Sequence, residues 1–317
     1  MTELTNLDQP LFDGADATKG DLVDYLDAVA EQLLGELRGR PLSVMRALRG
    51  RRPFMQKNVP RYAPPWIETV SIWAEASRRD VHYALCNDRE TLRWFANQRA
   101  VEYHPTLARL DDDGDAPRQT HLVLDLDPPA GAPFAVVAQT AQLVRQALAD
   151  AGLAGALKTS GAKGVHVFVP IAAPASGETS GEAIAAATRA LAARAERLDP
   201  ALATTAYVVE EREGRVFVDA TRAGGATVVA AYSPRIRPGA TVSFPLLWEE
   251  LEHADPTAFT IRTVPALLGD GNPWAEAMPA PQTLPDALVE EGRAIPVARV
   301  AAMHEGKRRA RAKREAS

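Results

Sequence analysis

Apolar residues follow two periodicities along the chain, one typical of helices and one typical of strands. Three- and four-residue spacing predicts helices over 22–37, 88–98, 134–151, 180–198 and 285–294. Alternating or β-branched runs predict strands over 42–48, 81–85, 101–105, 121–127, 165–169 and 216–219. Since no internal repeat or clear linker separates these elements, we expect one domain over 1–300 and a basic, disordered tail over 301–317.

The strand predicted over 121–127 carries two acids on one face. Leucines at 122, 124 and 126 point one way and Asp125 and Asp127 the other, because side chains alternate along a strand. Pro128 and Pro129 then end the strand, since proline cannot donate to a sheet ladder. Unpaired buried carboxylates are costly, so a pair of metal ions would explain both acids. An acidic strand end that leads into a proline turn is the alternative.

A glycine-rich turn over 159–164 leads into the strand over 165–169. It carries Ser160 and Lys163, and backbone amides beside a hydroxyl and a lysine form an anion pocket. It is not a Walker A loop, because Lys163 is followed by glycine and a strand. His166 shares a strand face with Phe168. It is either a phosphate or metal contact or a hydrogen-bonded core histidine.

A third acid, Asp219, ends the strand over 216–219, with arginines close by in the sequence at 212, 215, 222 and 235. A two-metal phosphoryl-transfer site requires a set of acids such as Asp125, Asp127 and Asp219. Carboxylate oxygens suit Mg²⁺ or Mn²⁺. The phosphates of a nucleoside triphosphate need cations and donors, and the candidates are Ser160, Lys163, His166 and Arg235. Together these residues indicate nucleotidyl transfer.

Composition narrows the class of protein. The 317-residue chain contains no run of about 18 apolar residues and no basic, apolar leader. Its one cysteine, Cys86, excludes an intrachain disulfide and a multi-cysteine zinc site. We therefore expect a cytoplasmic, nucleoid-associated protein with no membrane partner.

The net charge of −5 argues against nucleic acid, but the local charge distribution favours it. Residues 38–61 contain eight basic side chains and no acidic one, and a second basic cluster closes the chain. Such patches govern affinity for phosphate backbones. Phe54 in this stretch could stack on a base while Arg51, Arg52 and Lys57 hold phosphates. The alternative is a solvated loop with Phe54 in the core.

These motifs resemble the polymerase domain of the bacterial end-joining ligase D, in the archaeo-eukaryotic primase superfamily. The resemblance runs from about Leu4 to Trp274. Its first metal motif is similar to 125–129, its triphosphate motif to 159–166, and the strand of its third metal aspartate to 216–219; further matches lie at 54–57, 94–97 and 102–105. The resemblance implies an α+β primase–polymerase fold, with two facing β modules, one of them like an RNA-recognition motif, and flanking helices.

The resemblance also implies an activity: template-directed addition of nucleotides at DNA ends and gaps during double-strand break repair by non-homologous end joining. Ribonucleotides would be the preferred substrates and Mn²⁺ the preferred metal ion, with dNTPs and Mg²⁺ as the other candidates. The implied metal ligands are Asp125, Asp127 and Asp219. The implied nucleotide contacts are Ser160, Lys163, His166, Arg235, Arg212 and His104. Phe54 would stack on the template base, and Lys19 and Asn6 would bind a downstream 5′-phosphate.

Two departures from the family pattern affect this interpretation. Gln9 replaces a second lysine of the 5′-phosphate pocket, and Arg222 is followed by Ala223 where the family has a polar pair. These departures bear on 5′-phosphate dependence and on sugar selectivity. We expect any DNA ligase to be a separate chain, and the candidate protein partners are that ligase and the Ku ring. Alternative functions are de novo primer synthesis and catalytically idle DNA-end binding.

Overall fold

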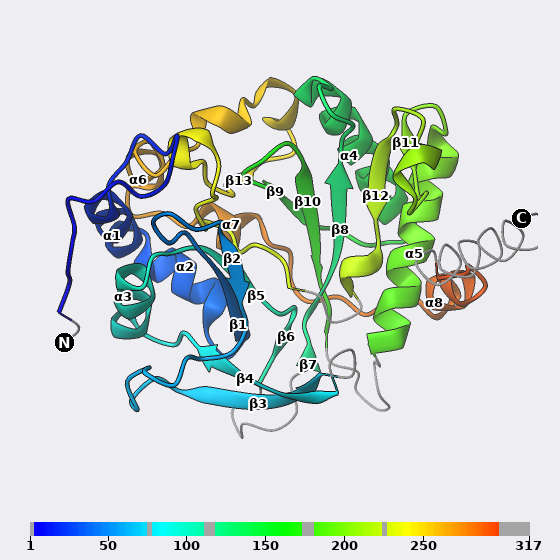
Figure 1. Cartoon of the computed structure of the whole chain (residues 1–317). Helices are drawn as coiled ribbons and strands as arrows, with labels where there is room; N and C mark the ends of the chain where they lie inside the picture. The colour runs from blue at the N-terminus through cyan, green and yellow to red at the C-terminus, as the bar shows by residue number, and fades with distance from the viewer. Residues whose placement is uncertain (1–2, 75–77, 111–117, 173–180, 224–226, 298–317) are drawn as a thin grey trace, which may run out of the picture. The chain divides into compact units, whose positions relative to one another are not determined.

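The computed structural model describes residues 3–74, 78–110, 118–172, 181–223 and 227–297 (Figure 1). The chain forms two compact units, each assembled from separate segments. The described residues of the first fall within 1–120, 156–163 and 225–278, and those of the second within 121–155, 164–224 and 279–297. A single domain over 1–300 stays a prediction, and the predicted tail over 301–317 lies outside the described residues.

The first unit contains a five-stranded antiparallel sheet built on β1 (Pro41–Arg46). One edge of β1 pairs with β5 (Ala100–Pro105). The other edge pairs with β4 (Arg79–Leu85) and then with β2 (Phe54–Gln56). β3 (Thr69–Ala74) extends the sheet from β4. The sequence predicted β1, β4 and β5, whereas β2 and β3 were not anticipated.

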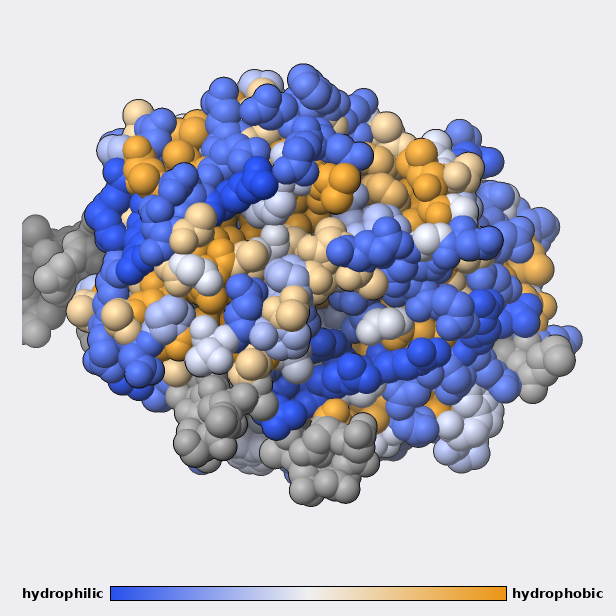
Figure 2. All heavy atoms as spheres, turned by 180° about the vertical axis from the view of Figure 1, so that it is seen from behind, coloured by the Kyte–Doolittle hydropathy of each residue, from blue (hydrophilic) through white to orange (hydrophobic). Residues whose placement is uncertain are grey.

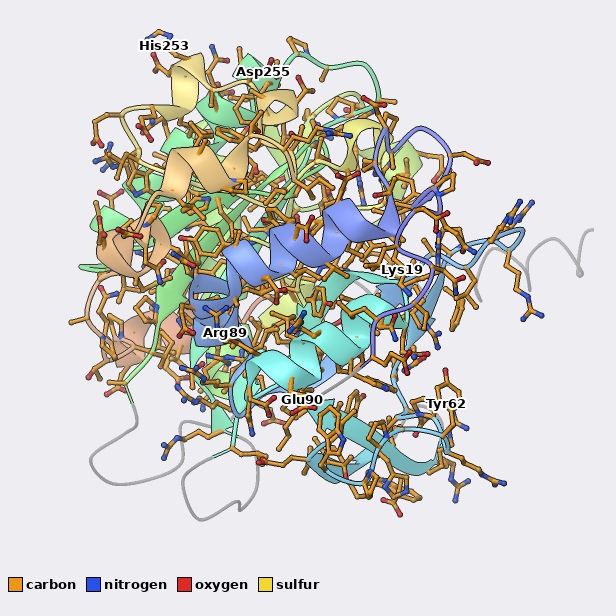
Figure 3. The ribbon with its side chains drawn as sticks, turned by 90° about the vertical axis from the view of Figure 1, so that its left-hand side faces the viewer. Lys19, Tyr62, Arg89, Glu90, His253 and Asp255 are labelled. Carbon is orange, nitrogen blue, oxygen red and sulfur yellow. The ribbon has the colours of Figure 1, made fainter. Side chains whose placement is uncertain are left out.

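Three helices pack in the same unit. α1 (Lys19–Ala28) begins at Thr18, whose side chain and that of Asp21 form a capping box. α2 (Ala30–Leu37) follows directly, so the single helix predicted over 22–37 is wrong in this respect. The break lies at Val29, a fully buried β-branched residue with ψ of 14°. α3 (Arg89–Asn97) lies beside α1 (Figure 3).

Short elements complete the first unit. They are the strand pairs β6 (Ala108–Arg109) with β7 (Arg118–Gln119) and β9 (Ala156–Thr159) with β13 (Pro245–Leu246), and the helices α6 (Val264–Leu268) and α7 (Pro273–Ala277). Of the surface loop predicted over 110–119, residues 111–117 lie outside the described residues, and the last two form β7. Elements this short leave little periodicity to read in a sequence.

The second unit contains four adjacent strands in the order β11 (Ala203–Thr204), β12 (Val216–Asp219), β8 (His121–Asp127) and β10 (Val165–Pro170). β11 and β12 are parallel, and the other pairs are antiparallel. The helices α4 (Phe134–Ala149) and α5 (Gly181–Leu198) contact each other and β8, and α8 (Asp286–Arg293) packs on α5 (Figure 1). The leucines of β8 are fully buried, as alternation predicted.

The surface mixes polar and apolar residues. Hydrophilic residues cover much of the face in Figure 2, and apolar side chains are interspersed among them. Among the described residues, no helix has both the length and the apolar character needed to cross a membrane.

The contact between α5 and α8 depends on a glycine. A Cβ atom built on Gly292 would lie 1.8 Å from the carbonyl oxygen of Ala186, so only glycine allows this approach. Gly35 in α2 is a useful comparison because it is exposed and nothing lies within 4 Å of its hypothetical Cβ.

We expect Gly292→Ala to lower the free energy of unfolding by about 1–3 kcal/mol, because the helices must separate or shift. Gly35→Ala should instead stabilise the protein by about 0.5–1 kcal/mol, since alanine favours helix. Urea unfolding followed by circular dichroism measures both. Equal effects of the two substitutions would contradict this account of helix packing.

Candidate active site

Three strands of the second unit bring an acid, a histidine and a second acid into one row across the sheet. Asp125 of β8 is directly opposite His166 of β10 and directly opposite Asp219 of β12. Directly opposed residues of an antiparallel pair share a face. Asp127, two residues further along β8, lies on that face as well. The predicted acids of the second unit are therefore adjacent.

A histidine and an arginine meet these acids. The Nε2 atom of His166 lies 3.2 Å from Oδ1 of Asp125. The Nε atom of Arg222 donates to Oδ2 of Asp125 at 3.2 Å and lies 3.5 Å from Oδ2 of Asp219. Burial opposes ionisation of Asp125, but His166 and Arg222 outweigh it and lower its pKa to about 2. Asp125 is thus a carboxylate held by ion pairs.

Asp127 is in the opposite situation. Burial and the nearby charge of Asp125 raise its pKa to about 6, with Asp219 adding to the shift. Arg222 and Arg212 act against it. The guanidinium carbon of Arg212 lies 3.9 Å from the ring centroid of Phe217, the residue opposite Asp127. This contact keeps Arg212 near the acids. Burial and the charges of Asp125 and Asp219 together therefore outweigh the effect of the arginines at Asp127.

The chemical type of these side chains and their negative charge suit a divalent cation. Carboxylate oxygens are the ligands that Mg²⁺ and Mn²⁺ prefer, and three carboxylates gather here with an excess of negative charge. The present side-chain positions are a different matter. Within the described ranges, no three His, Cys, Asp or Glu side chains converge as metal ligands. Arg222 contacts both Asp125 and Asp219, so its guanidinium would have to leave them for a metal ion to bind the two carboxylates.

In the first unit, the glycine-rich turn is held by close backbone contacts. Gly161 has φ of +67°, and a Cβ atom there would lie 2.6 Å from Cγ of Arg235. The Nη1 atom of Arg235 donates to the carbonyl oxygen of Ser160. Ser160 is buried, and Lys163 is exposed at the tip of the turn. Of the predicted triphosphate contacts, the structure thus brings Ser160 and Arg235 together.

A second cluster in the first unit links His104 to Arg235. The Nε2 atom of His104 lies 2.8 Å from Oε2 of Glu102, and Nε of Arg235 lies 3.2 Å from the same oxygen. The backbone amide of Ile236 donates to the other oxygen at 2.8 Å. Burial opposes ionisation of Glu102, but His104 and Arg235 lower its pKa to about 2. Sequence reasoning gave Glu102 no role, although alternation places it on the same face as His104.

The predicted DNA-binding residues lie in β2 and on both sides of it, with Arg51 and Arg52 before the strand and Lys57 after it. Phe54 is 39% exposed, so it is not a core residue. The guanidinium carbon of Arg46, its partner on β1, lies 5.8 Å from the ring centroid. Arg51, Arg52 and Lys57 are exposed. An exposed ring beside exposed cations is the arrangement that stacking on a base requires.

The residues predicted to bind a 5′-phosphate lie in one segment. The backbone amide of Lys19 donates to the carbonyl oxygen of Gln9 at 2.8 Å. Asn6, three residues before Gln9, adopts a positive φ of 54°. Lys19 is 3% exposed; Figure 3 labels its position at the start of α1. Its Nζ atom donates to the carbonyl oxygen of Thr5 at 2.5 Å and to Oδ1 of Asn97 at 2.6 Å. Two of its three donors are therefore already used.

Comparison with known proteins identifies the family. The protein-family model of the LigD primase-polymerase domain matches residues 18–274 of this chain. The chain belongs to the LigD primase–polymerase family. The resemblance seen in the motifs is thereby confirmed. LigD primase–polymerase domains are nucleotidyltransferases, so this chain is an enzyme of that class and acts on nucleotides.

Relatives and a solved structure agree with this assignment. The chain is 35% identical over 257 residues to the multifunctional non-homologous end joining protein LigD of Mycobacterium bovis, covering 78% of this chain and 33% of that protein. It is 31% identical over 266 residues to the bifunctional LigD of Bacillus subtilis, covering 83% of this chain and 41% of that one. The chain thus spans a third to two fifths of these relatives.

The solved structure is the polymerase domain of Mycobacterium tuberculosis ligase D in complex with DNA. It superposes with a TM-score of 0.78 at 31% identity, covering 93% of this chain and 99% of that one. The predicted α+β class is confirmed by this match.

Arg222, like Glu102, is a residue whose contacts sequence reasoning did not anticipate; its position three residues after Asp219 was the available signal.

The raised pKa of Asp127 predicts a pH-dependent stability in the metal-free protein. An unfolded aspartate ionises near its ordinary pKa of 3.8, whereas folded Asp127 resists ionisation up to about 6. Stability is therefore lost as pH rises through this interval and stays lost above it. Asp127→Asn should raise the unfolding temperature in EDTA at pH 8 and have little effect at pH 4.

The control is Asp24→Asn, which removes an exposed carboxylate of α1. Differential scanning fluorimetry from pH 4 to pH 8 compares the variants with the wild-type protein. A stabilisation by Asp127→Asn that is the same at every pH would contradict the assignment.

Proposed function

We propose that this chain is a template-directed polymerase that adds nucleotides at DNA ends and gaps in bacterial double-strand break repair by end joining. The observation that carries the proposal is the carboxylate row of β8 and β12 in a chain of the LigD primase–polymerase family. The names of the relatives, which are end-joining proteins, support the repair context.

Asp125, Asp127 and Asp219 would hold divalent metal ions, Mn²⁺ or Mg²⁺. Such ions polarise the attacking hydroxyl and neutralise the phosphates in nucleotidyl transfer. Burial, and then the charges of Asp125 and Asp219, raise the pKa of Asp127. Arg222 would release Asp125 and Asp219 when metal binds, and its guanidinium would then be free to contact a phosphate. His166 would keep Asp125 oriented.

The incoming nucleoside triphosphate would be bound by Ser160, Lys163, His166 and Arg235, with Arg212 near the acids. Contacts of Arg235 support this role, because Glu102 and the Ser160 carbonyl fix its guanidinium. A fixed cation loses little entropy on binding. His104, hydrogen-bonded to the same Glu102, would contact the nucleotide sugar or the primer end. Ribonucleotides are the expected substrates, with dNTPs also accepted.

DNA would lie on the basic stretch, with Phe54 on the template base and Arg51, Arg52 and Lys57 on phosphates. The polymerase domain of Mycobacterium tuberculosis ligase D was solved in complex with DNA, which supports DNA as the ligand here. Lys19 and Asn6 would approach a downstream 5′-phosphate. A DNA ligase and Ku are the proposed protein partners, and the cytoplasm, at the nucleoid, is the proposed compartment.

Primer extension on a gapped duplex tests the activity. Wild-type protein with Mn²⁺ should add templated ribonucleotides, and Asp125→Ala/Asp127→Ala should reduce addition by at least about 10³-fold, because both metal positions lose ligands. DNA binding, measured by fluorescence anisotropy, should stay within about threefold. Binding without extension by the wild-type protein would instead indicate an idle end-binding factor. Synthesis without a primer would indicate a primase.

Metal binding can be measured independently of polymerase activity, through the thermal stability of the protein. Mn²⁺ should raise the unfolding temperature of the wild-type protein, because ligand binding to the folded state stabilises it by mass action. Asp125→Asn/Asp127→Asn should show no such shift. An equal shift in both proteins would mean that the ion binds elsewhere.

Phe54→Ala should weaken binding to a duplex with a single-stranded template overhang by about 5- to 150-fold, because stacking on a base contributes about 1–3 kcal/mol. The matched control is Met55→Ala, its neighbour on β2, which is also 39% exposed but has no ring. Anisotropy titrations with both variants decide the point. Equal losses would show that apolar contact, not ring stacking, is involved.

A further inference from the structure

One carboxylate of the first unit, that of Glu102, joins two of the proposed nucleotide contacts. Its Oε2 atom lies 2.8 Å from Nε2 of His104 and 3.2 Å from Nε of Arg235. Both side chains therefore depend on the same oxygen atom. Glu102 itself has no place among the proposed metal, nucleotide or DNA contacts.

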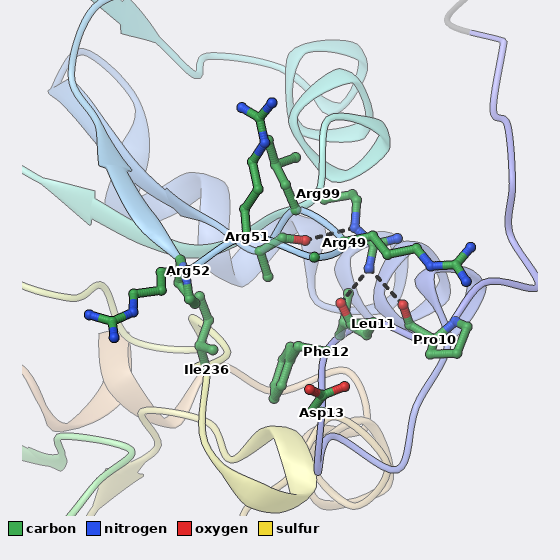
Figure 4. A pocket seen from close by; sticks show the side chains of 13 residues that line it. Pro10, Leu11, Phe12, Asp13, Arg49, Arg51, Arg52, Arg99 and Ile236 are labelled. Atoms are coloured by element: carbon green, nitrogen blue, oxygen red, sulfur yellow. Dashed lines mark hydrogen bonds between the residues drawn. The ribbon is translucent and has the colours of Figure 1, made fainter.

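Backbone hydrogen bonds bring Arg235 to Glu102. The chain before Arg235 runs along β5, where the amide of Ala230 donates to the carbonyl oxygen of Tyr103 at 2.9 Å. The side chain of Ile236 lines the pocket shown in Figure 4. Its backbone amide donates to Oε1 of Glu102 at 2.8 Å. The carboxylate is therefore held by the segment that carries Arg235 and by its own strand.

The contact between Glu102 and Arg235 depends on charge. Nε of Arg235 makes no aligned hydrogen bond with the residues that the structure describes, so its contact with Oε2 is an ion pair. Glu102 is 6% exposed. Apolar residues can often replace a buried ion pair without loss of stability, so stability alone does not account for this pair. Glutamine would remove the charge at nearly the same size.

Charge also decides which nitrogen of His104 carries the proton. Burial lowers the pKa of His104, and the charges of Arg235 and Lys158 add to this shift, whereas Glu102 acts against it. The imidazole is therefore neutral at about pH 7. An ionised carboxylate only accepts hydrogen bonds, so Nε2 of His104 donates to Glu102. A neutral imidazole that donates from Nε2 has its lone pair on Nδ1.

This lone pair has no partner in the protein. Within the described part of the chain, the hydrogen bond to Glu102 is the only one that the His104 ring makes. Ser43 is directly opposite His104 on β1, and its buried hydroxyl also makes no hydrogen bond with the described residues. A hydroxyl group of a ligand is a complementary partner for Nδ1, because it can donate to a lone pair.

We propose that Glu102 is a positioning residue for the nucleotide. It keeps His104 in the Nε2–H form, so that Nδ1 accepts a hydrogen bond from a sugar hydroxyl, and it orients Arg235 for the triphosphate. The proposal rests on the proposed function, which places His104 and Arg235 at the nucleotide. The hydroxyl belongs either to the incoming nucleotide or to the primer terminus. These two sources share their chemistry, and experiment separates them.

The first test is the tautomer of His104, measured by ¹⁵N NMR of the imidazole nitrogens in the full, metal-free chain. Wild-type protein should show the Nε2–H form. Glu102→Gln should shift His104 toward the Nδ1–H form, because an amide nitrogen donates where the carboxylate accepted. The matched control is Glu250→Gln, since Glu250 is an exposed carboxylate that accepts from the amide of Leu247 at 2.9 Å.

Two outcomes of this test overturn the proposal. One is a wild-type His104 in the Nδ1–H form, which decides the matter even if Glu102→Gln fails to fold. The other is a tautomer that is the same in Glu102→Gln as in the wild-type protein and Glu250→Gln.

Nucleotide affinity tests the role of Glu102 at Arg235. Calorimetric titrations in Mg²⁺ compare ATP with inorganic triphosphate, which has no sugar. Glu102→Gln should weaken triphosphate binding by about tenfold, the loss of one charge-assisted contact, and Glu250→Gln should not. Unchanged triphosphate affinity in Glu102→Gln overturns this role.

The same titrations locate the hydroxyl. A greater loss for ATP than for triphosphate in Glu102→Gln assigns it to the incoming nucleotide. An equal loss assigns it to the primer terminus, and a primer–template duplex should then shift the Nδ1 signal of His104 in the wild-type protein. An Nδ1 signal that responds neither to ATP nor to the duplex overturns the acceptor role.

These measurements need no primer extension, so they separate this proposal from the proposed function. Suppose that His104 is in the Nε2–H form and that nucleotide binding depends on Glu102, but the wild-type protein extends no primer. The role of Glu102 would then be retained and the polymerase rejected. Primer extension by a wild-type protein whose His104 is in the Nδ1–H form would retain the polymerase and reject the role of Glu102.

Discussion

The burial of like charges side by side is the constraint on which the candidate active site depends. Asp125, Asp127 and Asp219 concentrate negative charge on one face of a sheet whose opposite face is closed by leucines. Isolated carboxylates cannot remain ionised in such a place without cations. Arg222 supplies a cation here, and His166 lies beside Asp125. A cation at this position is therefore required by the charge distribution, whether a side chain or a metal ion provides it.

Strand register determines this concentration of charge. β8 pairs with β10 on one side and with β12 on the other, so Asp125 lies opposite His166 in one and opposite Asp219 in the other. A shift by one residue would exchange the acids with the leucine face and bury them in the core. Gly164 helps to hold the register, because a Cβ atom there would lie 2.2 Å from the carbonyl oxygen of Leu126.

Three arginines of the first unit have guanidinium groups that are anchored by the backbone. Backbone carbonyl groups anchor the guanidinium of Arg46 through Gln98, that of Arg99 through Ala47, and that of Arg235 through Ser160. Anchored cations are already ordered before a phosphate arrives, so less conformational entropy is lost on binding. A polymerase that must bind many DNA sequences gains from such contacts, because phosphates are the same in every sequence.

The sequence alone predicted which residues would carry the chemistry, because alternation places Asp125 and Asp127 on one face and local motifs identify the family. It did not reveal the break at Val29, the strand β2, or the bond from His104 to Glu102. Arg222 and Asp125 are 97 residues apart, and the ion pair between them follows from strand register. Periodicity assigns a side chain to a face, whereas its partner, burial and charge depend on segments that only the tertiary structure brings together.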